Sequence, residues 1–151
     1  MPVDKRTYTA AEEAAMNVIR RWCDEGWTKG HVDVADEIID PGFRVHGAGG
    51  QVVEPGIEGL KDLVRAWRTG FPDAVQRVDQ IMAIGDTVIV RLTWEGTHLG
   101  EFLGVPPSGK RVSVETIGID RVVDGKVVEG WGQLDMLGLM TTIGGVKSTV
   151  G

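Results

Sequence analysis

The chain of 151 residues contains one cysteine (Cys23), three histidines (His31, His46 and His98) and no long hydrophobic run. A single cysteine excludes an internal disulfide and a metal site built from several thiolates, and the histidines lack any close ligand spacing. No window approaches about 18 consecutive apolar residues, and residues 1–6 lack a basic stretch followed by an apolar one. We therefore expect a cytoplasmic protein with no membrane span, no export signal and no bound metal.

Positive charge is also in short supply. The chain has 16 Lys and Arg against 22 Asp and Glu, which gives a formal net charge of −6, and its basic residues are scattered. Since nucleic acids are bound through clustered Lys and Arg, we expect no nucleic-acid partner. A hydrophobic fraction of 42% and a charged fraction of 25% are typical of soluble globular domains. The length predicts one domain over residues 1–151, with an ordered core from about 9 to 144.

The first half of the chain has the periodicity of helices. Thr9-Ala10-Ala11-Glu12 has the spacing of a capping box, and apolar residues then recur at helical intervals until Gly30. A shorter helix is predicted over Val32–Ile39, a short strand over Phe43–His46, and another helix from about Ile57 to Thr69.

The second half changes to β-rich runs separated by turn signals at Gly85-Asp86 and Asp124-Gly125. We expect strands over Val75–Ile84, Thr87–Glu95, Arg111–Val123 and Lys126–Leu134. Helices followed by an antiparallel meander indicate an α+β fold rather than an alternating α/β fold. We expect a curved antiparallel sheet that forms a cone-shaped α+β barrel, with N-terminal helices packed over it and a small-molecule site at its apolar mouth.

Asp135 directly follows the last predicted strand and opens the apolar run Met136–Met140. One interpretation is structural, because Asp is a good N-cap for a short C-terminal helix. The other is chemical, because a carboxylate beside apolar strands has its charged form disfavoured and gains a pKa suited to proton transfer. The two roles are compatible, and both stay open.

The register of the last hairpin decides which side chains accompany Asp135. A bulged turn would pair Ile119 with Glu129 and Ile117 with Trp131, whereas a plain two-residue turn would move Asp135 to the side of Asp120. We favour the bulged turn because it gathers a tryptophan and two isoleucines into an apolar wall. The residues that then share one face are Glu115, Ile117, Ile119, Arg121, Trp131, Gln133 and Asp135.

Four further side chains are candidates for the pocket. Glu115 could divide acid and base roles with Asp135, or it could lie on an exposed strand face. His98 could act as an acid, a base or a hydrogen-bond donor, or it could fix the loop that follows it. His46 and Trp94 are candidates for lining the pocket.

Several segments together resemble one known family, the SnoaL-like polyketide cyclases. This family belongs to the nuclear-transport-factor-two-like superfamily, which includes ketosteroid isomerase and scytalone dehydratase. The similarity spans about Ala10 to Gly144. It is carried by Phe71-Pro72-Asp73, Trp94-Glu95-Gly96-Thr97-His98, Gly100-Glu101-Phe102-Leu103-Gly104-Val105-Pro106-Pro107-Ser108-Gly109-Lys110, Asp124-Gly125-Lys126-Val127-Val128-Glu129-Gly130-Trp131 and Asp135.

The resemblance implies a largely apolar pocket, no cofactor and a homo-oligomer, either a dimer or a tetramer. It implies that an aspartate matching Asp135 is the general acid/base of an intramolecular aldol condensation. Holding the developing enolate then falls to Arg121, Gln133 or His98. Gly130 and Ile119 depart from the family pattern, in which larger or polar residues stand.

The function expected from this resemblance is a cofactor-independent cyclase (a lyase or isomerase in type) of secondary metabolism, acting on a polyketide-like or other apolar carbonyl substrate. The alternatives are a hydrolase or hydratase, for example an epoxide-opening enzyme, in the same pocket, or a non-catalytic module for ligand binding or dimerisation.

Overall fold

The N-terminal helical segment begins and ends in different helical forms. A computed structural model describes residues 6–47 and 51–147. Helix α1 (Ala10–Arg21) starts with the predicted capping box, in which the Glu12 N–H donates to Thr9 Oγ1 at 3.1 Å. The chain then continues as a π-helical turn, Trp22–Thr28, which the sequence did not predict. Gly26 permits this turn because a Cβ there would lie 2.4 Å from a ring carbon of Trp22.

Two short helices and one long helix complete the layer before the main strands. A 3₁₀ turn at Val32–Val34 leads into α2 (Ala35–Ile38), and α3 follows over Gly56–Gly70. Helix α3 buries Leu60 and Val64 on its inner face, as its periodicity predicts.

The strands form one six-stranded sheet in the order β2-β1-β6-β5-β4-β3 among the described residues. The strands are β1 (Ile39–His46), β2 (Val52–Val53), β3 (Val75–Ile84), β4 (Thr87–Thr97), β5 (Arg111–Val123) and β6 (Lys126–Leu134). The sheet is mixed, because β1 runs parallel to β6 while the other pairs are antiparallel, and it is not closed. The α+β class and the antiparallel meander β3-β4-β5-β6 are confirmed.

Strand β1 is longer than predicted because Pro41 falls at an irregularity of the ladder. The register between β1 and β6 shifts between Ile39 and Arg44. A proline can stand in such a gap, where no ladder hydrogen bond is required of it.

The hairpin between β5 and β6 combines features of both predicted registers. Asp124 and Gly125 have φ values of 50° and 77°, which matches a two-residue Asp-Gly turn, and Val123 pairs with Lys126. A register shift follows at once, between Arg121 and Val122. The predicted pairs were therefore wrong by two residues.

In the observed register, Ile117 lies opposite Gln133, Ile119 opposite Trp131, and Arg121 opposite Glu129. A shift of two residues leaves each side chain on its face. The odd-numbered residues of β5 and β6 accordingly share a face, as expected.

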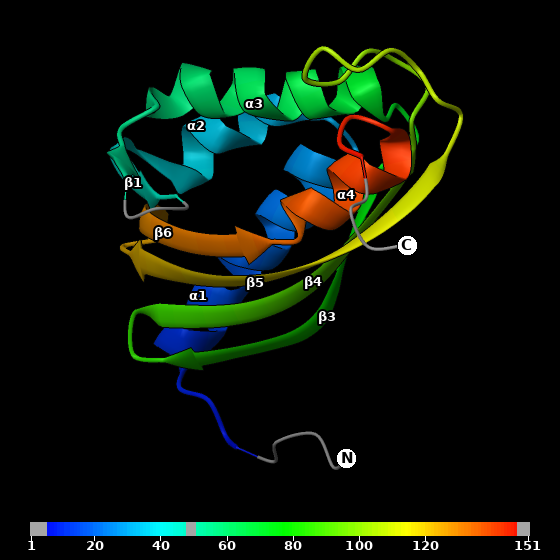
Figure 1. The fold of residues 1–151 in the computed structure, drawn as a ribbon. Helices are drawn as coiled ribbons and strands as arrows, with labels where there is room; N and C mark the ends of the chain where they lie inside the picture. Colours follow the sequence, from blue (N-terminus) through cyan, green and yellow to red (C-terminus); the bar gives the residue numbers. More distant parts are fainter. Residues whose placement is uncertain (1–5, 48–50, 148–151) are drawn as a thin grey trace.

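The helices lie on one side of the curved sheet (Figure 1). Helix α1 and the π-helical turn contact β3, α3 contacts β1, and the C-terminal helix α4 (Met136–Ile143) contacts β5. Two hydrophobic clusters fill the space between the layers. One cluster includes Met16 of α1 and Ile39 of β1, packed with residues of the sheet. The other includes Phe71, packed with residues of α4 and the end of β4.

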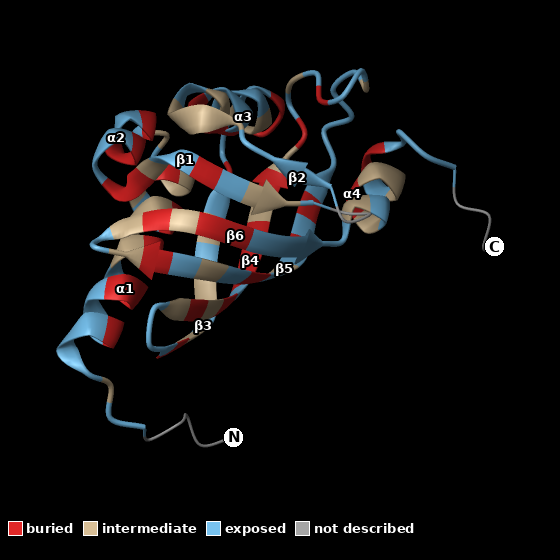
Figure 2. Cartoon of the chain, turned by 90° about the vertical axis from the view of Figure 1, so that its left-hand side faces the viewer, coloured by how far each residue is buried: buried red, intermediate tan, exposed pale blue. Residues whose placement is uncertain are grey.

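The opposite side of the sheet is exposed over parts of β5 and β6, which Figure 2 shows in pale blue. Ile117, Ile119 and Trp131 lie there with exposed fractions of 57%, 39% and 41%. The face that the sequence analysis assigned to the pocket is thus the outer face of the sheet.

Candidate functional site

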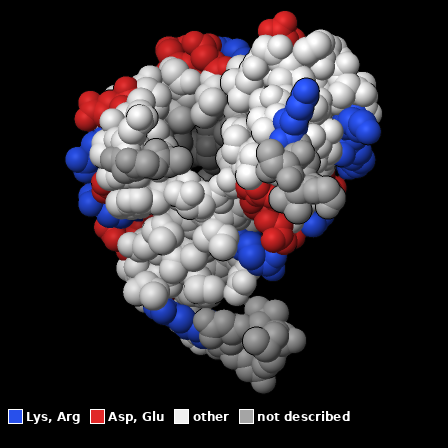
Figure 3. Space-filling model, viewed as in Figure 1, with Lys and Arg blue, Asp and Glu red and all other residues white. Residues whose placement is uncertain are grey.

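A cavity of about 210 Å³ lies between the helices and the inner face of the sheet. Figure 3 shows the molecular surface hollowed between α3 and β6, with few charged side chains at the rim. The walls come from α1, the π-helical turn, β1, α3 and four further strands. The lining residues are Ile19, Trp22, Cys23, Trp27, Ile39, Phe43, Val45, Leu60, Gln76, Val90, Leu92, Gly118, Asp120, Val127, Gly130, Trp131 and Gly132.

Three glycines leave room in the sheet wall of this pocket. Gly118 and Gly132 are paired across β5 and β6, and Gly130 pairs with Asp120. A Cβ at Gly130 would lie 2.7 Å from Asp120 Oδ1, whereas a Cβ at Gly132 would meet nothing within 4 Å. Gly130 therefore makes space for the carboxylate of Asp120.

Asp120 is the carboxylate of the pocket. It is partly buried, and it alternates along β5 with residues that face outward. Burial raises the pKa of Asp120 to about 7, and desolvation is the cause of this shift. A carboxyl group that titrates near neutral pH can both take up and release a proton during a reaction.

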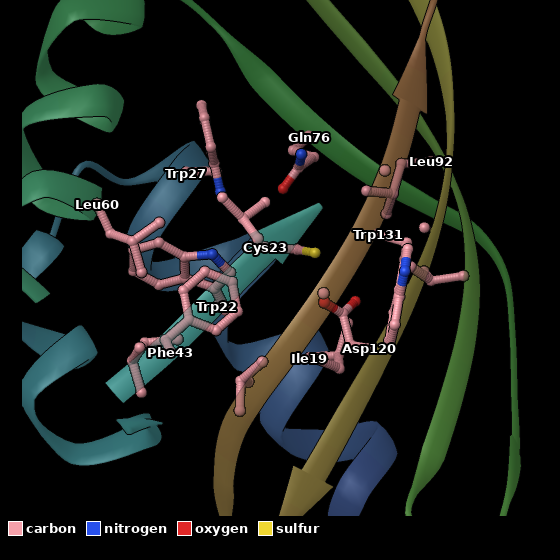
Figure 4. A pocket seen from close by; sticks show the side chains of 17 residues that line it. Ile19, Trp22, Cys23, Trp27, Phe43, Leu60, Gln76, Leu92, Asp120 and Trp131 are labelled. Carbon is pink, nitrogen blue, oxygen red and sulfur yellow. The ribbon is translucent and has the colours of Figure 1, made fainter. Parts of the chain in front are cut away.

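The π-helical turn places Cys23 and two tryptophans on the helical side of the pocket. Figure 4 shows Trp22, Cys23 and Trp27 facing the strand that carries Asp120. Burial, assisted by the nearby charge of Asp120, raises the pKa of the Cys23 thiol to about 12. The thiol is therefore neutral at physiological pH and is poorly suited to act as a nucleophile.

Gln76 on β3 contributes a side-chain amide to the pocket wall. Its backbone is tied to the π-helical turn, because the Gln76 N–H donates to Thr28 Oγ1 at 2.9 Å and the Thr28 hydroxyl donates to the Gln76 carbonyl at 3.3 Å. In Figure 4 the Gln76 amide and the Asp120 carboxylate lie at different ends of the group of labelled side chains, with Cys23 between them.

Asp135 does not lie in this pocket. It is exposed and caps α4, where its Oδ1 accepts a hydrogen bond from the Gly138 N–H at 2.8 Å. The structure thus gives Asp135 the N-cap geometry of the first interpretation, and the carboxylate beside apolar strands is Asp120.

His98 and Trp94 lie in the second hydrophobic cluster rather than in the pocket. His98 is fully buried, and its Nδ1 accepts a hydrogen bond from the Ser108 N–H at 3.1 Å. An accepting Nδ1 places the proton of a neutral ring on Nε2. The Trp94 ring packs edge-on against Phe71, at a centroid distance of 4.8 Å. Both residues are placed to hold the loop after β4 and the core beneath it.

The remaining predicted site residues gather on the outer face of the sheet. His46 Nε2 lies 2.7 Å from Glu129 Oε1, and the His46 ring stacks on Trp131 at 4.5 Å. The hydrogen bond from His46 is the main cause that lowers the pKa of Glu129, and Arg44 and Arg121 add to it. Glu115 is 75% exposed beside Arg91, and Gln133 is also exposed. The residues brought together on this face are His46, Glu115, Ile117, Ile119, Arg121, Trp131 and Gln133; of these only Trp131 borders the pocket.

Asp120 was not among the site residues expected from the sequence, although the sequence carries a signal for it. The even positions of β5 include Val112, Val114 and Val122, which are buried. A carboxylate within such a series is a candidate for a functional group, because a charge is rarely placed on a buried face without a role. Ile117 and Ile119 pointed to the opposite conclusion, because two isoleucines at odd-numbered positions of β5 suggest that the odd-numbered residues are the buried ones.

Within residues 6–47 and 51–147, no group of three or more His, Cys, Asp or Glu side chains is placed to hold a metal ion. No helix in those ranges has the length and apolar character needed to cross a membrane.

Fold and pocket together define a class: a curved sheet covered by helices, with one partly buried carboxylate in an apolar cavity. Residues 17–143 match the SnoaL-like polyketide cyclase family, and the chain belongs to this family.

Individual relatives agree with this assignment. The chain is 28% identical over 116 residues to nogalonic acid methyl ester cyclase of Streptomyces nogalater, covering 76% of this chain and 87% of the relative. It is 37% identical over 60 residues to aklanonic acid methyl ester cyclase of Streptomyces peucetius, covering 40% and 41% of the two chains. A crystal structure assigned as a SnoaL-like polyketide cyclase of Jannaschia sp. CCS1 superposes with a TM-score of 0.83 at 35% identity, covering 91% of this chain and 96% of that one.

Proposed function

We propose that the protein is a polyketide cyclase in which Asp120 is the general acid/base. The observation that carries this proposal is the Asp120 carboxyl group in an apolar pocket, where burial raises its pKa to about 7. The two named relatives are cyclases of nogalonic acid methyl ester and aklanonic acid methyl ester, and the family is that of polyketide cyclases, which supports a polyketide-like substrate.

The reaction needs one proton acceptor and a folded substrate. Ionised Asp120 removes a proton from the carbon between two carbonyl groups, and the resulting enolate carbon attacks a ketone of the same molecule. One C–C bond forms, and the new alkoxide takes the proton back from Asp120. The pocket contributes by holding the chain near its reactive conformation, which lowers the entropic barrier. All atoms of the substrate remain in the product, so proton transfer and orientation are sufficient.

The test is turnover of aklanonic acid methyl ester and nogalonic acid methyl ester by the wild type and by Asp120→Asn. Asparagine keeps the shape of the side chain and cannot accept the proton, so we expect kcat to fall by about 10² to 10⁴. For the wild type, kcat/KM should rise with pH through about 7, where Asp120 ionises.

Asp135→Asn is the matched control, because it makes the same change at an exposed carboxylate. Full turnover by Asp120→Asn would contradict the proposal. Loss of turnover in Asp135→Asn alone would transfer the role to Asp135. Incorporation of labelled solvent oxygen into the product would indicate hydrolase or hydratase chemistry in place of ring closure.

The proposal includes a homo-oligomer formed through the outer face of the sheet. Apolar side chains at Ile117, Ile119 and Trp131 are exposed there, beside Arg121 and Glu115, which carry opposite charges. A surface that carries both signs of charge around an apolar centre can pair with a second copy across a two-fold axis. A second copy of this chain is therefore the partner that we propose.

A further inference from the structure

One polar atom in the pocket lacks the partner that its burial requires. Gln76 Oε1 is buried and has no hydrogen-bond partner among the described residues. A buried carbonyl oxygen without a donor costs roughly 1 to 3 kcal/mol, and more than about 90% of buried polar groups in proteins are paired. An exception in the wall of a cavity is a place where a bound molecule can supply the missing donor.

The backbone that carries this side chain is held by the surrounding structure. Both backbone groups of Gln76 bond to the Thr28 hydroxyl, at 2.9 and 3.3 Å, and Thr28 ends the π-helical turn that carries Cys23 and Trp27. The side-chain amide of Gln76 therefore extends into the pocket from a strand whose backbone is anchored by hydrogen bonds, not from a loop. Figure 4 shows its oxygen directed toward the space beside Cys23.

We propose that Gln76 is a substrate-positioning residue that accepts a hydrogen bond from a hydroxyl group of the substrate, at the end of the pocket away from Asp120. This rests on the proposed function, and it narrows the substrate class to molecules that carry a hydrogen-bond donor, such as a phenol or enol hydroxyl, at this point. The substrate is then held at two points, with the hydroxyl at Gln76 and the reacting carbon at Asp120. Such two-point binding selects one of the folded forms of a flexible chain.

Neighbouring polar groups do not replace Gln76 in this role. The Trp22 and Trp27 indole N–H groups are donors and cannot accept from a hydroxyl. The Cys23 sulfur is a weak acceptor. Gln76 is thus the neutral strong acceptor in the side-chain lining of the pocket.

The experiment measures binding of two small probes, 2-naphthol and 2-methoxynaphthalene, by quenching of tryptophan fluorescence. The probes share one ring system, and only 2-naphthol can donate a hydrogen bond. We expect the wild type to prefer 2-naphthol by about fivefold to tenfold, which is the usual value of one hydrogen bond. In Gln76→Met, a substitution of similar size without an acceptor amide, this preference should fall to about one.

Gln80→Met is the matched control, because Gln80 lies on the same strand, is exposed and does not line this pocket. It should keep the wild-type preference, and so should Asp120→Asn, because the hydroxyl is held at Gln76, away from Asp120. If Gln76→Met does not fold, judged by circular dichroism, the wild-type side-chain amide signals of Gln76 in NMR spectra give the answer. They should shift with 2-naphthol and not with the ether.

Equal affinity of the wild type for the two probes would overturn the proposal, and so would a preference that survives in Gln76→Met. A preference lost in Asp120→Asn and kept in Gln76→Met would also overturn it, because the hydroxyl would then bind at Asp120. These readouts need no turnover. Failure of the proposed acid/base role of Asp120 would therefore appear separately, in the kinetics.

Discussion

At the scale of single residues, the position of the Asp120 carboxylate in the pocket depends on the residue beside it, Gly130. Gly130 faces the carboxylate across the β5–β6 pairing, and any larger residue would displace Oδ1. The resemblance to the family led us to expect a larger or polar residue where Gly130 stands. In the structure it is the residue that lets an aspartate occupy this wall.

Gly130→Ala should impair catalysis through position alone. Its methyl group would lie 2.7 Å from Asp120 Oδ1, so the carboxylate must move. Displacement of a catalytic group by about 1 Å can cost up to about 10² in rate, and we expect kcat to fall by about one to two orders of magnitude.

Gly132→Ala, on the same strand and face, adds a methyl group with nothing within 4 Å and should keep kcat near the wild-type value. Steady-state kinetics on aklanonic acid methyl ester measures both variants. Equal kcat values for the two alanine variants would show that the position of the Asp120 carboxylate does not limit turnover.

The burial of Asp120 should also be visible in stability. In the folded protein this carboxyl keeps its proton up to about pH 7, whereas an unfolded aspartate loses it near pH 4. Between these values the folded state binds more protons, so this residue lowers the free energy of unfolding as pH rises from about 4 to 7. Below pH 4 the penalty is absent, and above pH 7 it is complete.

Asp120→Asn should therefore gain stability relative to the wild type as pH rises through this window, by on the order of 2 to 4 kcal/mol. The other carboxylates titrate in both proteins, so their contributions cancel in the difference. Urea unfolding at pH 4.5, 6 and 8 measures this difference. A stability difference that is the same at all three pH values would mean that the pKa of Asp120 is not raised in the folded protein.

At the scale of elements, most local structure could be predicted from the sequence. The limits of β3, β5 and β6 match the predicted runs, because glycine and aspartate turn signals bound β-branched segments without ambiguity. The parallel pairing of β1 with β6 could not be predicted, since it joins segments about 90 residues apart and leaves no local pattern.

The candidate site was harder to predict than the elements, because it depends on which face of β5 is buried. Ile117 and Ile119 are apolar yet exposed, while Asp120 is charged yet partly buried. Alternation fixes which residues share a face, but only the packing of the helices decides which face is inside. The π-helical turn, which brings Cys23 to the pocket, likewise depends on the contact of Gly26 with Trp22.

Asp135 is best tested as part of helix α4. Its Oδ1 satisfies the Gly138 N–H, so Asp135→Ala removes an N-cap and should lower the free energy of unfolding by about 0.5 to 2 kcal/mol. Asp135→Ser keeps a capping oxygen and should lose little stability. Turnover should be the same in both variants, because Asp135 lies outside the pocket.

Urea unfolding and steady-state kinetics on the two Asp135 variants provide the check. Loss of turnover in both variants, with the fold intact by circular dichroism, would return the catalytic role to Asp135. Equal stability of both variants and the wild type would instead show that the cap contributes nothing to α4.

At the scale of the whole molecule, the two faces of the sheet differ in their surroundings and in the side chains that they present. The inner face holds the pocket, where glycines and an aspartate interrupt an otherwise apolar wall. The outer face exposes Ile117 and Ile119 with Trp131, and charged groups such as Arg121 and Glu129 lie around them. An exposed apolar surface of this kind favours association, while a net charge of −6 opposes unspecific aggregation.

Ile117→Glu should therefore convert the proposed oligomer into a monomer. Ile117 is 57% exposed, so the substitution should leave the fold intact, but in an interface it would bury one carboxylate per copy without a partner. Leu63→Glu is the control, because Leu63 is 45% exposed on α3, on the helical side of the sheet, and should leave the assembly unchanged. Sedimentation equilibrium at micromolar concentration measures the mass of each protein. A monomeric wild type, or an Ile117→Glu variant that keeps the mass of the wild-type oligomer, would show that the outer face of the sheet does not hold copies of this chain together.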